Sequence, residues 1–129
     1  ACWPGGLTVV VPQRPDVQWP AALTGGSPTI GLRVPDHDAP RTLARGVGPL
    51  PTTSANVSGA PEASDAAGII AQLGDAIDLV LDGGPAVGGP ASTIVDCTGT
   101  EPSILRAGAV PVERVAEILA AGGIRLAEG

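Results

Sequence analysis

Short apolar runs separated by glycine, proline and polar residues dominate the chain. Residues 7–11 form an apolar, β-branched run closed by Pro12, and "PTIGLRVP" (residues 28–35) has a similar character. Runs of this length and composition predict buried strands. Residues 13–27, which lie between them, are rich in proline, glycine and polar residues and are predicted to form a loop.

Three segments are predicted to be helices, and each has a recognisable start. Asp38 is a residue type favoured at an N-cap, and Pro40 in the first turn favours a helix that extends to about Arg45. "SDAAGIIAQLG" (residues 64–74) opens on two polar residues and closes on a glycine, with apolar residues between them. The last helix starts at Pro111 and repeats apolar residues at helical spacing.

The remaining elements are predicted to be extended. Residues 50–53 form a short extended segment, and "IDLVLDGG" (residues 77–84) is predicted to be a buried strand that ends in a glycine turn. "STIVDC" (92–97) and "SILRAG" (103–108) are predicted to be two strands joined by the turn "TGTEP". The order of elements predicts an α/β (α+β) domain with a mixed sheet rather than a strict βαβ array.

Composition limits the classes of function. The 129 residues suit one domain, and 19 glycines and 14 prolines favour short elements and many turns. A net charge of −6 argues against a broad surface that follows phosphates, although a local nucleotide pocket stays possible. Cys2 and Cys97 are too few for a metal-site spacing or a disulfide framework, so we expect reduced thiols in a cytoplasmic protein. No apolar run has the length of a membrane span.

Two arginines interrupt apolar strand patterns near the strand ends. Arg33 lies in "TIGLRVP" and Arg106 in "SILRAG". A buried guanidinium group needs an anionic partner or several acceptors. One interpretation is a buried ion pair with Asp82 or Asp96. The other is a pair of anion clamps that hold a carboxylate or a phosphate.

Three further motifs have a structural and a functional interpretation. The glycine-rich loop "LDGGPAVGGPAST" (81–93) could approach a phosphate, but it lacks the ending of a P-loop and a plain turn is favoured. His37 is the single histidine, and without a GxSxG elbow a solvated turn residue is favoured over acyl transfer. "TTSANVSG" (52–59) gathers four hydroxyls and an amide, whose partners are either the backbone or a ligand.

Five stretches in register resemble the YrdC-like domain of the threonylcarbamoyl-AMP synthase family: "WPGGLTVVVP", "TIGLRVPDH", "TTSANVSGAP", "LDGGPAVGGPAST" and "SILRAGAV". The resemblance extends from Trp3 to about Val112. It implies a twisted mixed sheet with helices on both faces. It also implies a cytoplasmic enzyme that joins L-threonine, bicarbonate and ATP into threonylcarbamoyl-AMP with release of pyrophosphate, the first step of the t6A modification of tRNA.

The resemblance also implies roles for individual residues. The ATP-binding positions of the family match Thr29, Ser54, Asn56 and Arg106. The threonine-binding positions match Arg33, Thr52 and Ser92. ATP would bring Mg²⁺, and no residue is expected to ligate a metal or to be a covalent catalyst. Expected partners include downstream t6A transfer proteins but no membrane, and direct binding of tRNA is left open.

Two departures from the family pattern change what is expected. The chain has no lysine, so the family's KxR motif is absent, and Glu62 stands where many relatives have a serine that helps to bind ATP. The chain also opens directly on a strand-like run. We therefore expect residues 1–129 to be the C-terminal two-thirds of a YrdC-like domain, N-terminally incomplete and inactive alone.

Two alternatives are kept beside the synthase. One is the carbamoyl-adenylating YrdC-like domain of a hydrogenase-maturation carbamoyltransferase. The other is a non-catalytic relative that binds nucleotide or RNA.

Overall fold

A computed structural model describes residues 2–17 and 19–127 of the chain. Their elements, in chain order, are β1 (Leu7–Pro12), α1 (Ala21–Thr24), β2 (Thr29–Leu32), α2 (Asp38–Val47), α3 (Ala66–Leu73), the 3₁₀ helix η1 (Gly74–Ala76), β3 (Thr93–Asp96), β4 (Ser103–Arg106) and α4 (Val112–Ala121). Helix α1 lies inside the segment predicted to be a loop. It has four residues, which are too few to show a helical period.

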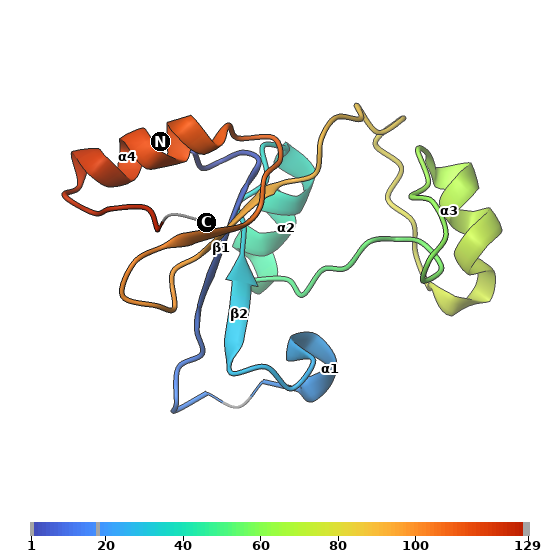
Figure 1. Ribbon diagram of the computed structural model, residues 1–129. Coiled ribbons are helices and arrows are strands. Elements are labelled where there is room, and N and C mark those ends of the chain that lie inside the picture. The colour runs from blue at the N-terminus through green and yellow to red at the C-terminus, as the bar shows by residue number, and fades with distance from the viewer. Residues whose placement is uncertain (1, 18, 128–129) are drawn as a thin grey trace.

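The four strands form one sheet in the order β2-β1-β3-β4 (Figure 1). Strand β1 pairs antiparallel with β2 and parallel with β3, and β3 pairs antiparallel with β4. Helices α4 and α2 lie on opposite sides of the central strands. The predicted α/β class, with a mixed sheet and helices on both faces, is confirmed.

One face of the sheet is apolar and is covered by α4. Val9 pairs with Leu32 of β2 and with Val95 of β3, and paired residues point to the same side. Val95 and Val115 of α4 are both buried there. A cavity of about 120 Å³ remains between the sheet and α4; it is lined by Cys2, Leu7, Val9, Val95, Cys97, Val115, Ile118 and Leu119.

The start of α2 differs from the prediction by one residue. His37 is the N-cap, because its Nδ1 accepts a hydrogen bond from the Ala39 backbone N–H at 3.2 Å. Asp38, predicted as the cap, is the first helical residue and accepts a hydrogen bond from Arg41 at 2.6 Å instead. His37 therefore has a local structural role, in agreement with its interpretation as a turn residue.

Helix α3 follows its sequence signals closely. The Asp65 side chain accepts a hydrogen bond from Gly68 N–H at 2.8 Å and caps the helix. Gly74 ends the helix with a positive φ of 47°, a conformation that L-residues with side chains adopt at a cost.

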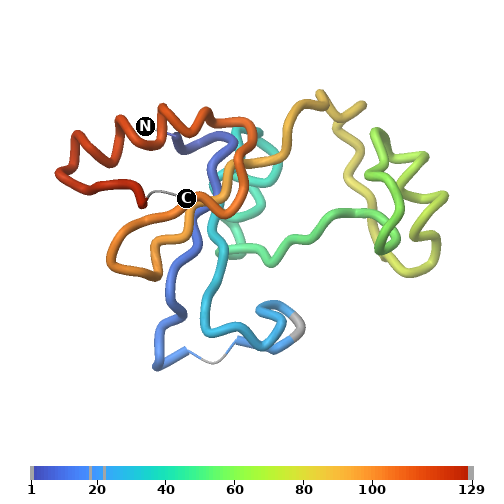
Figure 2. Tube along the Cα trace, viewed as in Figure 1, coloured from blue at the N-terminus to red at the C-terminus, as the bar shows by residue number. Residues whose placement is uncertain are grey.

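One predicted strand is absent. Residues 77–84, and the predicted extended segment 50–53, pair with no strand in the described part of the chain. Leu79 and Leu81 are 75% and 66% exposed, so residues 77–84 are not buried as predicted. An apolar run becomes a strand only when a neighbouring strand edge is available. Figure 2 shows the reason: the α3 segment projects away from the sheet, and two extended connections link it to the rest.

Much apolar surface is open. The described chain exposes 9117 Å², whereas a folded monomer of 12.6 kDa would expose about 6,200 Å². Helix α2 has no fully buried residue, and its Leu43 and Val47 are exposed. None of the helices in the described ranges is long and apolar enough to cross a membrane.

Candidate functional site

The sheet face opposite α4 carries polar side chains from all four strands or their immediate ends. Thr8 of β1 pairs with Ile94 of β3, and Ile94 pairs with Arg106 of β4, so Thr8 and Arg106 share this face. On the other side of β1, Val10 pairs with Gly31 of β2. Side chains alternate along a strand. The same face therefore also carries Thr29 and, one residue beyond the end of β2, Arg33.

Arg106 and Ser92 are directly joined. The Arg106 guanidinium donates to the Ser92 backbone oxygen from Nε at 3.0 Å and from Nη2 at 2.9 Å. Nη2 also lies 3.1 Å from the Ser92 hydroxyl oxygen, to which it donates. The Ser92 hydroxyl in turn lies 2.8 Å from the Thr8 hydroxyl. Two predicted site residues thus lie together, and Thr8 joins them.

Arg33 lies on the other flank of Thr8. The register of β1 and β2, continued by one residue, places Arg33 opposite Thr8. Its Nε donates to the Gly5 backbone oxygen at 2.9 Å. This single bond orients the side chain and leaves the remaining guanidinium donors for another acceptor.

Of the two interpretations of these arginines, the buried ion pair is contradicted. In the described part of the chain no carboxylate pairs with Arg33 or Arg106. Asp82 accepts instead from Gly84 N–H, and Asp96 from Thr98 N–H. Hydrogen bonding from Thr98 lowers the pKa of Asp96. Both arginines are exposed rather than buried, so neither requires an internal counter-ion.

The strand order sets the distance between the two cations. Arg33 follows β2 and Arg106 ends β4, so three strand spacings separate them. At about 4.8 Å for each spacing, their backbones are roughly 14 Å apart. Both side chains extend toward the central strands, because Arg106 donates to Ser92, just before β3, and Arg33 donates to Gly5, before β1.

Thr29 is the first residue of β2. Its hydroxyl lies 2.8 Å from the Ser27 hydroxyl, and its backbone N–H donates to Ser27 Oγ at 3.2 Å. The register pairs Thr29 with Pro12, the last residue of β1. Arg33 lies opposite the start of β1, so Thr29 lies on the same face as Arg33 but at the opposite end of β2.

The segment 52–59 is not part of this face. The Asn56 amide donates to the backbone oxygens of Val57 and Ala60, at 3.1 and 2.8 Å, and so closes a turn. Gln72 of α3 accepts from Val57 N–H at 3.1 Å and holds this turn against α3. The partners of Asn56 are therefore backbone groups.

The other polar residues near this segment are exposed. Ser54 and Thr52 lie on the connection between α2 and α3, as does Glu62 beyond the turn. No hydrogen bond joins Ser54, Asn56 or Thr52 to Arg33, Ser92 or Arg106 among the described residues. The structure brings together Arg33, Ser92 and Arg106, and leaves these three polar positions apart.

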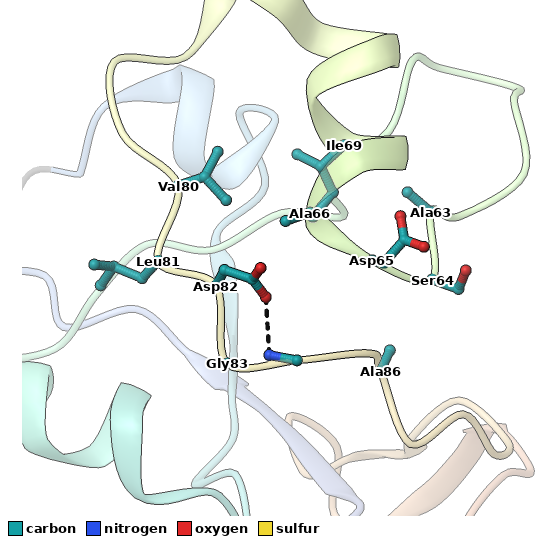
Figure 3. A pocket seen from close by; sticks show the side chains of 11 residues that line it. Ala63, Ser64, Asp65, Ala66, Ile69, Val80, Leu81, Asp82, Gly83 and Ala86 are labelled. Carbon is teal, nitrogen blue, oxygen red and sulfur yellow. Dashed lines mark hydrogen bonds between the residues drawn. The ribbon is translucent and has the colours of Figure 1, made fainter.

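A second concavity of about 130 Å³ lies between the start of α3 and the glycine-rich loop (Figure 3). Asp65 and Asp82 both line it, and each accepts a backbone hydrogen bond of its own turn. Ala86 N–H donates to the Ser64 backbone oxygen at 2.7 Å and ties the loop to α3. Two carboxylates disfavour a phosphate here. Within the loop, the Asp82 carboxylate and Gly84 N–H form a local turn.

The sequence did not single out Thr8 as a candidate site residue. It lies in the run "LTVVVP", where threonine suits a strand as well as valine does. The available signal was that Thr8 is the one polar residue in this apolar run. Only the register shows that it faces Ser92 rather than α4.

The chain was compared with known proteins. The family model described as "Telomere recombination" (Sua5/YciO/YrdC) matches residues 1–108. A relative from Mycobacterium tuberculosis is 46% identical over 119 residues, which are 92% of this chain and 54% of that protein. The threonylcarbamoyl-AMP synthase of Bacillus subtilis is 36% identical over 118 residues, which are 91% of this chain and 34% of that enzyme.

A comparison of structures agrees. The crystal structure of Pyrococcus abyssi Sua5 complexed with L-threonine matches with a TM-score of 0.81 and 34% identity, and the match covers 97% of this chain and 36% of that one. A solution structure of a Methanobacterium thermoautotrophicum protein matches with a TM-score of 0.58 and 40% identity, over 84% and 50% of the two chains.

The fold and the polar face define a mixed α/β domain with an arginine-flanked polar sheet face. The chain belongs to the Sua5/YciO/YrdC family. It spans about half the length of its mycobacterial relative and about a third of the Bacillus and Pyrococcus proteins.

Proposed function

We propose that this chain carries the sheet-face part of a threonylcarbamoyl-AMP synthase site. The reaction would convert L-threonine, bicarbonate and ATP into threonylcarbamoyl-AMP and pyrophosphate for the t6A modification of tRNA. The observation that carries the proposal is the single sheet face on which Arg33, Ser92 and Arg106 lie. Relatives named threonylcarbamoyl-AMP synthase and a relative solved with L-threonine support the choice of substrates.

The amino-acid end of the ligand would lie near Arg33. A free amino acid carries a carboxylate, and a guanidinium with unused donors is suited to hold it. Ser92, two strands away from Arg33 in the sheet order, would add a neutral donor. The amine of threonine attacks CO₂ formed from bicarbonate, loses a proton and becomes a carbamate.

The nucleotide end would lie near Arg106. A carbamate oxygen attacks the α-phosphorus of ATP, the bond to the β-phosphate oxygen breaks, and pyrophosphate leaves. Negative charge accumulates on the α-phosphate during this step. A fixed cation such as Arg106, oriented by its two bonds to the Ser92 backbone oxygen, would stabilise that charge.

Mg²⁺ would arrive with the phosphates of ATP. In the described ranges no group of three or more His, Cys, Asp or Glu side chains could hold a metal ion. We therefore expect Mg²⁺ to be held mainly by the phosphates of ATP rather than by protein side chains. Thr29 and Ser54 would serve the nucleotide and Thr52 the amino acid, whereas Asn56, expected to bind ATP, would hold its turn through two backbone oxygens. The location would be the cytoplasm.

Ligand binding tests the proposal directly. We expect the chain to bind ATP·Mg²⁺ and L-threonine, each measured by isothermal titration calorimetry and by chemical-shift changes. The changes should centre on residues 29–33, 92–96 and 103–106. Binding of either ligand only at the second concavity, near Asp65 and Asp82, would contradict the proposal. GTP and D-threonine serve as matched controls of specificity.

A further inference from the structure

The hydroxyl of Thr8 lies at the centre of the polar face. Its oxygen is 2.8 Å from Ser92 Oγ on one side. On the other side, the register places Arg33 opposite Thr8. We propose that Thr8 is a positioning residue for the amino-acid subsite, which holds the Ser92 hydroxyl in the orientation that binds ligand. This inference rests on the proposed function.

Thr8 has this role when its hydroxyl is the donor in the hydrogen bond to Ser92. A serine hydroxyl has one hydrogen and two acceptor sites. Arg106 Nη2 donates to one of the acceptor sites of Ser92. If Thr8 donates to the second, the hydrogen of Ser92 is left for an acceptor of the ligand, such as a carboxylate or carbamate oxygen. Thr8 and Arg106 together would then make Ser92 a donor.

Packing alone would not require this hydroxyl. The next three residues of β1 are valines, and valine has the same branched shape as threonine. The Thr8 methyl group already packs toward Gly31: a Cβ added to Gly31 would lie 3.4 Å from Thr8 Cγ2. The strand thus needs the shape of the side chain at position 8. The hydroxyl contacts Ser92, which is itself buried.

The experiment compares Thr8→Val with Thr8→Ser in the full chain. Binding of L-threonine and of ATP·Mg²⁺ is measured by calorimetry for each variant. We expect Thr8→Val to weaken threonine binding about three- to tenfold, the loss of one oriented hydrogen bond, and to change ATP binding by less than twofold. Thr8→Ser should restore threonine binding to within twofold. Thr42→Val, at an exposed threonine of α2, is the matched control.

A double-mutant cycle with Ser92→Ala separates positioning from general destabilisation. If Thr8 acts through Ser92, Thr8→Val should have no further effect on threonine binding in the Ser92→Ala background. Equal loss in both backgrounds, or unchanged binding in Thr8→Val, would overturn the inference and leave the proposed function intact. Absence of threonine binding to the unmodified chain would overturn both. Should Thr8→Val fail to fold, Thr8→Ala takes its place in the same cycle.

Discussion

Arg106 donates to the backbone oxygen of Ser92 through two nitrogens, at 3.0 and 2.9 Å. Two bonds to one oxygen hold the plane of the guanidinium in a fixed direction across the sheet. Arg33, in contrast, is held by one bond to Gly5. The two cations of the face therefore differ in rigidity, and their substitutions should have different effects.

Arg33→Ala should weaken L-threonine binding more than ATP binding. The loss of a charge-assisted contact costs roughly 1.5–3 kcal/mol, or about ten- to a hundredfold in affinity. Calorimetric titration of each ligand measures the two affinities. Arg45→Ala, at an exposed arginine of α2, is the control. Equal loss for both ligands would mean that Arg33 supports the fold through Gly5 rather than binding substrate.

Asn56→Ala should lower stability, whereas Ser54→Ala should weaken ATP binding. Asn56 closes a turn with two backbone contacts, so its loss should lower the free energy of unfolding by about 1 kcal/mol. Ser54 is exposed, and its loss should leave stability unchanged while weakening ATP binding. Thermal unfolding with and without ATP measures both effects. A stable Asn56→Ala variant that loses ATP binding would make Asn56 a ligand contact.

Acid should loosen the start of α2. The hydrogen bond from Arg41 lowers the pKa of Asp38 below its ordinary value of 3.8. A carboxyl group with a lowered pKa in the folded state stabilises that state above the unfolded pKa, and this stabilisation is lost as the pH falls through the folded pKa. The protection of the α2 amides from exchange, relative to the intrinsic rate at each pH, should therefore fall below about pH 3.8. In the Asp38→Asn variant, α2 should not show this pH dependence. If the variant shows the same pH dependence as the unmodified chain, Asp38 is not its origin.

Cys97 should react slowly with iodoacetamide at pH 8. Burial beside α4, and secondly the charge of Asp96, raise the pKa of this thiol above its ordinary value of 9.0. The thiolate is the reactive form, so less of it is present than for a free cysteine. Mass spectrometry of timed samples measures the rate at Cys97. The same chain in urea is the control, and an equal rate in both would show that Cys97 is not protected.

The chain alone should not release pyrophosphate from ATP, threonine and bicarbonate. Its seven basic residues are all arginines, and Arg33 and Arg106 lie on the polar sheet face. A triphosphate held by so few cations is poorly stabilised at the transition state. A coupled pyrophosphate assay measures turnover, with a full-length relative as positive control. Turnover at the rate of that relative would contradict the expectation.

The sequence predicted those elements whose signals are local. Asp65 and Gly74 mark α3 by their own side chain or backbone preference, and β1 and β3 carry enough β-branched residues to be found. The prediction of a strand at residues 77–84 was wrong because an apolar run indicates burial but does not show which segment it packs against. The α3 segment projects from the sheet, so this run meets no strand edge.

The site was predicted in part, for a related reason. Arg33 and Arg106 stood out because each is a charge within an apolar strand, but their ion-pair partners depended on distances that the sequence does not contain. Thr8 was hidden because threonine is an ordinary strand residue. The segment 52–59 was interpretable either as a turn or as a ligand site, and the structure shows the turn contacts of Asn56.

The parallel pairing of β1 with β3 joins residues far apart along the chain. Leu7 pairs with Thr93 and Val10 with Asp96, so the centre of the sheet closes a loop of more than eighty residues. Contacts of such high sequence separation slow folding, because the entropy of closing the loop is lost before the contacts form. During synthesis on a ribosome, β2 can pair with one edge of β1 early, but the other edge of β1 must wait unpaired until β3 has emerged. The folding of this chain should accordingly depend on how quickly residues 13–92 are translated.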